Sequence, residues 1–158
     1  EIKQEVTLAA FSAAKARGCV TILNPAPYQP LSKELLEVTD WIIPNETEFK
    51  ELHGQAPNSD EVLKGFRPGK NSIVTLGSEG AVLITSDGNL TRVSAPKVNA
   101  VDTTGAGDAF VGVFAFGLAS GKSPEDAMKL GIKVASMSVT RKGAQSSYPS
   151  QAEIETLS

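Results

Sequence analysis

The sequence predicts an α/β fold in which helices cover a mostly parallel sheet, and three observations favour this class. Short β-branched runs alternate with helical segments along the first half of the chain, which is typical of a parallel sheet. A single hairpin pattern follows, before two long helical segments. With 158 residues, 41% of them hydrophobic, the chain has enough apolar surface for one packed domain.

The first half begins with residues 1–17, whose apolar positions recur at roughly the helical period up to Gly18. The run CVTILN at 19–24 predicts a buried strand, with Cys19 as a buried thiol in a reducing compartment. NPAPYQP is expected to be a loop, because three prolines in seven residues disfavour helix and strand alike. A serine-capped helix at 32–39, a strand from 41 and a helix at 46–54 are expected next. Residues 55–72 are expected to be irregular apart from a helix at 59–66, and a strand follows at 71–77.

The second half contains a hairpin, two long helices and a tail. The sequence DGN at 87–89 predicts the hairpin turn between two strands. The helix from 104 to about 120 is apolar nearly all round, which suits a buried position. In the next helix Ser123 is the expected cap and Pro124 the first helical residue. The remaining elements are strands at 81–86 and 90–96, the second long helix within 121–141, and a tail at 143–154 that is a loop and then a short helix.

Composition excludes several classes of function. Charged residues make up 21% of the chain and the net charge is −3, without a basic block, so neither nucleic acid nor an anionic membrane is an expected partner. One cysteine can form neither an internal disulfide nor a thiolate metal cluster. No apolar stretch approaches the roughly 20 residues of a membrane span and no signal peptide is visible, so a cytoplasmic location is expected. Because the chain starts at Glu1 inside a helical pattern, we expect a cut end there.

The stretch VDTTGAGDAFVG at 101–112 contains the strongest chemical signal. The first N–H groups of a helix lack partners and lie at its positive end, and glycines give an anion access to them. A bound phosphate would repel Asp108, so this carboxylate suggests acid–base chemistry on an attacking hydroxyl. Alternatively, Asp108 only complements the helix dipole and the glycines only form a tight turn. The spacing fits neither a Walker A loop nor GxGxxG.

The segment DTTGAGDAF resembles the C-terminal signature of the ribokinase-like (PfkB) sugar kinases. Four other segments resemble motifs of this family and occur in the same order: LNPAP, IIPNETEFKELHG, IVTLGSEGAVL and VTRKGAQSSYP. The resemblance covers essentially the whole chain. It implies a ribokinase-like three-layer α/β/α sandwich (Rossmann-like), incomplete because the N-terminal strands and lid are absent, with residues 1–158 as the C-terminal, nucleotide-binding part of the kinase domain.

The resemblance implies that the full-length parent transfers the γ-phosphoryl of ATP to O5 of D-ribose, with Mg²⁺ and K⁺, as a homodimer. The tail is the evidence for ribose, because sugar selection depends mostly on the absent half. Two alternatives stay open: another PfkB kinase acting on fructose, a nucleoside or a deoxy sugar, and a truncated non-catalytic fragment that binds nucleotide. On its own the fragment is expected to be inactive and to aggregate, since missing strands expose a sheet edge and an apolar face.

The implied catalytic residues lie in the glycine stretch, with Asp108 as the base and Gly105, Ala106 and Gly107 as the anion hole. Asn45 and Glu48 match an NxxE motif that organises Mg²⁺ and phosphates, largely through water; alternatively, Glu48 is a solvated carboxylate at a helix start. The implied nucleotide-binding residues are Thr75, Gly77, Gly80 and Ile132.

A monovalent cation site for K⁺ is also implied, with Asp102 and the carbonyl of Thr104 as ligands. Alternatively, Asp102 only caps the glycine turn by accepting hydrogen bonds from nearby amides. The other implied oxygens belong to Ser138, Arg141, Gly143 and Ser147. Two departures from the family stand out: the segment between Gly54 and Ile73 is shorter than is typical, and Ile132 occupies a position near the adenine where Asn or His is common.

Overall fold

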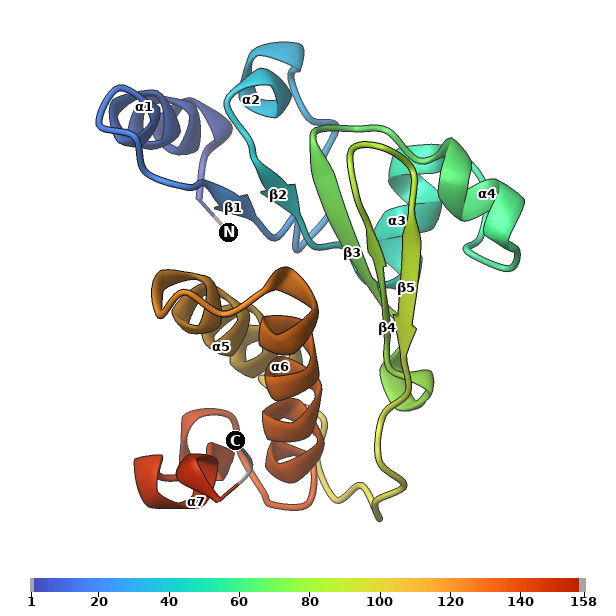
Figure 1. Cartoon of the computed structure of the whole chain (residues 1–158), viewed down its shortest axis with the longest axis vertical. Helices are drawn as coiled ribbons and strands as arrows, with labels where there is room; N and C mark the ends of the chain where they lie inside the picture. The colour runs from blue at the N-terminus through green and yellow to red at the C-terminus, as the bar shows by residue number, and fades with distance from the viewer. Residues whose placement is uncertain (1, 157–158) are drawn as a thin grey trace. The chain divides into compact units, whose positions relative to one another are not determined.

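The computed structural model describes residues 2–156, and Figure 1 follows the chain from α1 to α7. The elements form two compact units, one made of the chain up to Leu76 with Val82–Thr91, the other of Gly77–Ala81 with the chain from Arg92. The helices are α1 (Gln4–Lys15), α2 (Lys33–Glu37), α3 (Glu46–His53), α4 (Asp60–Gly65), α5 (Ala106–Ala119), α6 (Pro124–Ser138) and α7 (Gln151–Glu155). The strands are β1 (Ile22–Leu23), β2 (Trp41–Ile42), β3 (Asn71–Thr75), β4 (Ala81–Ile84) and β5 (Leu90–Val93).

The five strands form one sheet in the order β1-β2-β3-β4-β5. β1 pairs with β2 and β2 with β3 in parallel, with Ile22 opposite Trp41 and Trp41 opposite Asn71. The links from β3 to β4 and from β4 to β5 are too short for a parallel crossover, so these strands run as hairpins. The α/β class, the parallel start of the sheet and the hairpin at DGN are therefore confirmed.

The prediction of a buried strand thiol at Cys19 was wrong. Cys19 is exposed, and its backbone N–H donates to the carbonyl of Ala14 at 3.0 Å in the turn that ends α1. The chain joins the sheet only at Ile22, so the strand is shorter than the apolar run 19–24 suggests. Val20 is accordingly 59% exposed. An apolar run alone does not specify at which residue strand pairing begins, because its first residues can belong to the preceding turn.

Helix and strand side chains share one core in the first unit. Alternating residues of the strands, such as Val82 and Ile84 of β4, point to the same side as the buried side chains of the helices. Leu35 of α2, Phe49 of α3 and Leu63 of α4 are each 1% exposed or less. The helices α1 to α4 therefore cover one face of the sheet with a continuous apolar layer.

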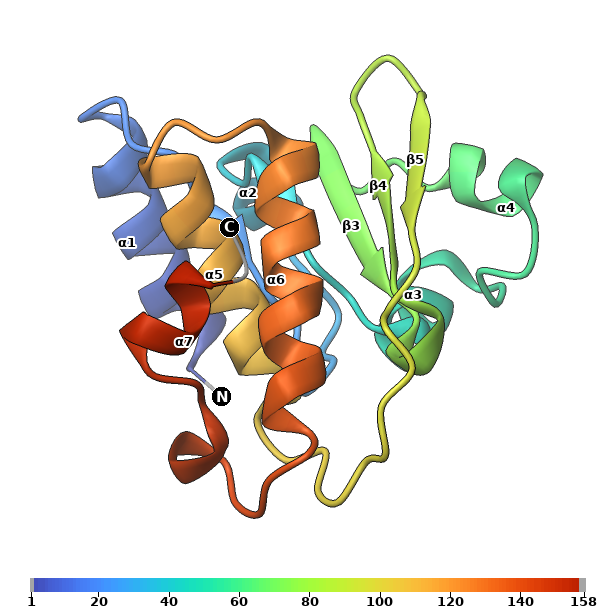
Figure 2. The ribbon, with the colours of Figure 1, turned by 60° about the horizontal axis from the view of Figure 1, so that its bottom comes forward.

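In the second unit α5 and α6 lie side by side (Figure 2). Glycines permit this close approach: a Cβ at Gly117 would lie 2.7 Å from Ala127, and one at Gly131 would lie 3.0 Å from the ring of Phe110. The buried position expected for the apolar helix α5 is found on one side only: Phe114 is fully buried, whereas Phe116 is 61% exposed. Apolar composition does not reveal that only one side of a helix receives packing partners.

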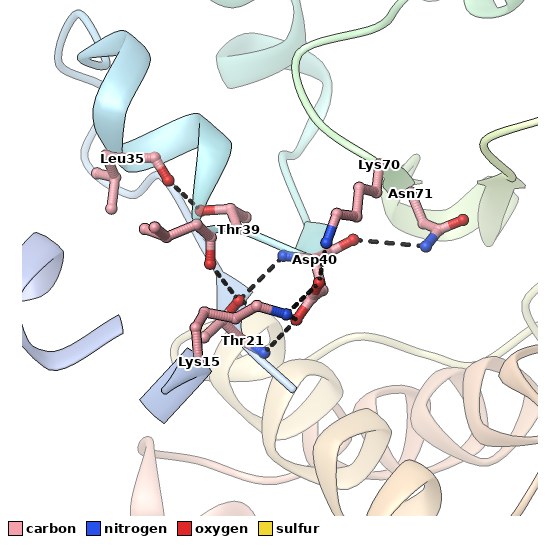
Figure 3. Close-up of polar contacts among 8 residues, drawn as sticks. Lys15, Thr21, Leu35, Thr39, Asp40, Lys70 and Asn71 are labelled. Carbon is pink, nitrogen blue, oxygen red and sulfur yellow. Dashed lines mark hydrogen bonds and ion pairs between the residues drawn. The ribbon is translucent and has the colours of Figure 1, made fainter. Parts of the chain in front are cut away.

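Asp40 connects the amino-terminal ends of three parallel strands (Figure 3). Its carboxylate accepts hydrogen bonds from Lys15 Nζ at 2.8 and 2.9 Å, from Lys70 Nζ at 2.8 Å and from the backbone N–H of Thr21 at 3.1 Å. Burial alone would raise the pKa of Asp40, but the hydrogen bonds from Lys15, Lys70 and Thr21 outweigh it and hold the pKa well below its usual range. Asp40, Thr21 and Lys70 immediately precede β2, β1 and β3, so this network lies at the start of all three strands.

Helix ends follow the sequence signals closely. The Ser123 hydroxyl accepts the N–H of Asp126, and Pro124 is the first residue of α6, as predicted. Gly54 ends α3 with φ +80°. Within residues 2–156, no helix has both the length and the apolar character needed to cross a membrane.

Candidate functional site

The glycine stretch opens α5 as predicted. Gly105 is the N-cap with φ +78°, a conformation that favours glycine, and the helix proper starts at Ala106. Asp108 lies in the first turn and is exposed. The carboxylate therefore stands at the positive end of the helix, open to solvent.

The amides of this first turn differ in their hydrogen bonding. The N–H of Ala106 donates to the carbonyl of Thr103 at 3.2 Å, so it is engaged within the turn. The N–H of Ala109 donates to the carbonyl of Gly105 at 2.9 Å. Among the described residues, the N–H groups of Gly107 and Asp108 have no such partner. An anion would thus meet Gly107 and Asp108, and the amide of Asp108 is a donor that the sequence analysis did not include.

Asp102 joins the glycine loop to the tail. One carboxylate oxygen accepts the N–H of Thr104 at 3.0 Å and the other accepts the N–H of Gly143 at 2.9 Å. These hydrogen bonds, that from Gly143 above all, lower the pKa of Asp102 to about 2. The local capping considered above is present at Thr104, but the second bond reaches a residue far along the chain. Asp102 is consequently an anion held between two loops.

The tail segment 139–148, which we call the strap, follows α6 and lies against the glycine loop. The carbonyl of Val139 accepts the N–H groups of Val101 at 2.7 Å and Asp102 at 3.1 Å. Asp102, Thr104 and Gly143, three of the residues implied for a cation site, are therefore brought together.

The other three implied ligands are held by local contacts. Ser138 is 1% exposed and its carbonyl accepts the N–H of Arg141 at 3.0 Å. The Arg141 guanidinium pairs with Glu153, so only its carbonyl is left for a cation. Ser147 is fully buried, and its hydroxyl donates to the carbonyl of Ala144 at 2.6 Å. All three lie in or next to the strap, and their role as ligands stays a prediction.

Tyr148 also contacts the glycine loop, and sequence reasoning missed it. Its hydroxyl donates to the carbonyl of Gly105 at 3.2 Å. Burial, and then the negative charge of Asp108, raises the pKa of Tyr148 above its usual value. A tyrosine in a loop has no periodic pattern that would reveal this contact.

Asn45 and Glu48 form a reciprocal capping box in the first unit. The side chain of Asn45 accepts the N–H of Glu48 at 2.9 Å, and the carboxylate of Glu48 accepts the backbone N–H and side-chain amide of Asn45 at 2.9 and 3.0 Å. The alternative of a solvated carboxylate was wrong, because Glu48 is only 6% exposed. Burial raises the pKa of Glu48, although the hydrogen bond from the Asn45 backbone opposes this.

The predicted nucleotide residues occupy three settings. Thr75 ends β3 and pairs with Asn45 in a parallel bridge. Gly77 and Gly80 bracket a turn with φ +52° and +103°, and a Cβ at Gly80 would collide with the carbonyl oxygen of Val93. Ile132 is 5% exposed on α6, so packing alone explains an apolar residue there. The backbone conformation and the lack of space for a Cβ therefore explain why position 80 is glycine. The nucleotide contacts of these residues stay predictions.

No group of three or more His, Cys, Asp and Glu side chains within residues 2–156 could together hold a metal ion. Protein magnesium sites often use one or two carboxylates with water and substrate phosphates, so such a group is not a requirement for Mg²⁺.

Comparison with known proteins follows the same motifs. The model of the pfkB family of carbohydrate kinases matches residues 1–151. Ribokinase from Schizosaccharomyces pombe is 37% identical over 164 residues, which cover 98% of this chain and 52% of that protein. Deoxyribokinase from Salmonella typhi is 39% identical over 157 residues, which cover 95% of this chain and 51% of that protein.

A solved structure gives the same result for the fold. Ribokinase from Arabidopsis thaliana, complexed with ribose and ATP, superposes with a TM-score of 0.91 and 34% identity, over 99% of this chain and 53% of that one. The ribokinase-like fold class is therefore confirmed. The chain spans about half the length of the relatives it matches.

Proposed function

Because the chain belongs to the pfkB family of carbohydrate kinases, we propose that the full-length protein phosphorylates D-ribose at O5, with ATP as the phosphoryl donor. The observation that supports this most is the first turn of α5, where the exposed carboxylate of Asp108 stands beside two amides that have no hydrogen-bond partner within residues 2–156. The family resemblance also supports a homodimer and a cytoplasmic location.

In this reaction Asp108 takes the proton from the attacking sugar hydroxyl as the O–P bond forms. Negative charge spreads over the oxygens of the phosphoryl group as the bond to ADP breaks. The N–H groups of Gly107 and Asp108, aided by the positive end of α5, stabilise that charge. Gly107 has no side chain to cover these amides, and within residues 2–156 no atom outside its neighbours and its own helix turn lies within 4 Å of where a Cβ would be, so an anion can approach them.

Glu48 and Asn45 would hold Mg²⁺ through water, and bound Mg²⁺ neutralises phosphate charge. Both carboxylate oxygens of Glu48 already accept a hydrogen bond from Asn45, and each has a further lone pair for a water molecule. This donor set fits a water-mediated site. The residue pair also fixes the start of α3, so it has a structural task as well.

The strap would hold K⁺ with Asp102 and neighbouring oxygens. A low pKa keeps Asp102 anionic at every physiological pH, and carboxylate and carbonyl oxygens suit a hard cation. Since Asp102 also bonds the amide of Thr104, a cation there would brace the loop that leads into α5.

Two sugars are close candidates for the substrate, ribose and deoxyribose. Ribokinase and deoxyribokinase relatives match this chain at 37% and 39% identity, so deoxyribose is a second candidate. Fructose and nucleosides, or nucleotide binding without catalysis, are further alternatives that the following assay separates.

The test is a kinase assay of the full-length protein with ribose, deoxyribose, fructose and a nucleoside, each with ATP and Mg²⁺. We expect ribose-dependent ADP release, which Asp108→Asn lowers by at least roughly 100-fold in kcat with little change in ATP affinity. Glu37→Gln, which changes a carboxylate whose side chain is 64% exposed, is the control and should behave like the wild type. Full activity of Asp108→Asn would remove this residue from the base role, and activity with another substrate alone would reassign the sugar.

A further inference from the structure

Tyr148 connects the strap to the start of α5 across 43 positions of sequence. Its hydroxyl donates to the carbonyl of Gly105 at 3.2 Å. The same carbonyl accepts the first hydrogen bond of the helix, from the N–H of Ala109 at 2.9 Å. Gly105 therefore has its carbonyl direction set by two donors, one from the helix and one from outside it.

The ring of Tyr148 is anchored by packing. It contacts a cluster formed by Ala109 of α5 with Leu130 and Val134 of α6. The strap also approaches Gly105 closely: a Cβ there would lie 2.8 Å from the Tyr148 hydroxyl oxygen and 3.2 Å from Ala144. The phenol is thus held at a fixed point on a packed surface.

Peptide geometry carries this contact to the anion hole. The peptide between Gly105 and Ala106 is planar and trans, so its C=O and N–H point in opposite directions. With the carbonyl held by Tyr148, the N–H of Ala106 points to Thr103, to whose carbonyl it donates at 3.2 Å. The next two N–H groups, of Gly107 and Asp108, are those left for an anion. Because α5 begins at Ala106, the peptides that follow keep helical geometry, so the direction of these two N–H groups is tied to that of the Gly105–Ala106 peptide.

We propose that Tyr148 is a positioning residue for phosphoryl transfer, which fixes the Gly105–Ala106 peptide and thereby aims the amides of Gly107 and Asp108 at the transferred group. This inference rests on the proposed function. Tyr148 does not touch the reacting atoms. It acts through one hydrogen bond, which its hydroxyl donates from the strap to the carbonyl of Gly105.

The test compares Tyr148→Phe with Thr140→Val in the full-length protein. The first change removes only the hydroxyl. The second removes another hydroxyl of the strap, which donates to the carbonyl of Met137 at 2.7 Å rather than to the glycine loop. For Tyr148→Phe we expect kcat to fall roughly 3- to 10-fold, the loss of one hydrogen bond, with both KM values within about 2-fold of the wild type. Thr140→Val should keep the wild-type kcat.

An unchanged kcat in Tyr148→Phe overturns the proposal. An equal fall in both variants also overturns it, because the cause is then a general loosening of the strap. Amide exchange separates this proposal from the proposed function. If the wild type phosphorylates no sugar, the proposed function fails, and exchange alone decides the positioning role. Exchange of the Ala109 N–H, about threefold or more faster in Tyr148→Phe than in Thr140→Val, supports that role, and equal exchange overturns it.

Discussion

Replacing Asp40 by asparagine tests whether one carboxylate holds the amino-terminal ends of β1, β2 and β3 together. The change keeps the size and shape of the side chain and removes its charge. The Asp40 side chain is only 14% exposed, and Lys15, which contacts both of its oxygens, is 33% exposed. Asparagine also places an NH₂ group where one oxygen accepted hydrogen bonds, so a donor then faces a donor.

The expected magnitude follows from these contacts. A hydrogen bond to a charged group contributes about 1.5–3 kcal/mol to stability when it is shielded from water. Lys70 is 56% exposed, so its share is screened and we assign it none. The bond from Thr21 can persist to the remaining oxygen of asparagine. We therefore expect Asp40→Asn to lower the free energy of unfolding by about 2–3 kcal/mol at neutral pH, mainly through the loss of Lys15.

The pH dependence has a definite sign. Because the pKa of Asp40 is depressed in the folded protein, its stabilisation is fully present above the unfolded pKa of about 3.9 and is lost as pH falls below it. Asparagine does not titrate. The difference in unfolding free energy between the wild type and Asp40→Asn should thus be constant from about pH 7 to 5 and shrink below about pH 4.

Urea unfolding of the purified full-length protein, followed by far-ultraviolet circular dichroism at several pH values, measures this difference. Glu37→Gln is the matched control, since Glu37 is 64% exposed and its nearest lysine nitrogen, on Lys33, is 3.9 Å away. It should change stability very little. The reasoning is refuted if Asp40→Asn is no more destabilising than Glu37→Gln, or if its effect persists unchanged at low pH.

Two further substitutions test separate parts of the structure. Gly80→Ala should destabilise the protein by more than about 2 kcal/mol, because φ is +103° and the new Cβ would meet the carbonyl of Val93 and lie 2.7 Å from the N atom of Ala95; a urea midpoint equal to the wild type would contradict this. Asp102→Asn should remove the stimulation of kinase activity by potassium, because it removes the charge and puts a donor opposite the amide of Thr104 or Gly143; rates in potassium and sodium buffers measure this, and a wild-type potassium response would contradict the cation site.

Local signals predicted much of the fold. The cap at Ser123 with Pro124, the end of α3 at Gly54 and the DGN hairpin each depend on residues within a few positions of one another. Such contacts are encoded in short stretches, so a single sequence suffices to find them. The opening of α5 by Gly105, with Asp108 in its first turn, belongs to the same class.

Long-range contacts were not predictable in this way. Lys15 and Lys70 meet Asp40 from 25 and 30 positions away, and Tyr148 meets Gly105 from 43. No periodicity links residues so far apart, because their proximity exists only once the elements have packed. The burial of Glu48 was not predicted for the same reason, because the residues that cover its side chain are brought there by the fold rather than by its own helix.

The central claim is that a phosphoryl group approaches the N-terminus of α5, and a pair of glycines on that helix tests it most directly. In the part of the chain that the structure describes, a Cβ at Gly107 or at Gly112 would meet no atom within 4 Å apart from its neighbours and its own helix backbone, so we expect alanine at either position to leave the fold intact or slightly more stable. Only the methyl at 107 would stand among the amides that face the anion. The measurement is kcat/KM for ATP in the full-length protein. We predict a fall of at least roughly 10-fold for Gly107→Ala and a wild-type value for Gly112→Ala. Equal values for the two variants would contradict the claim.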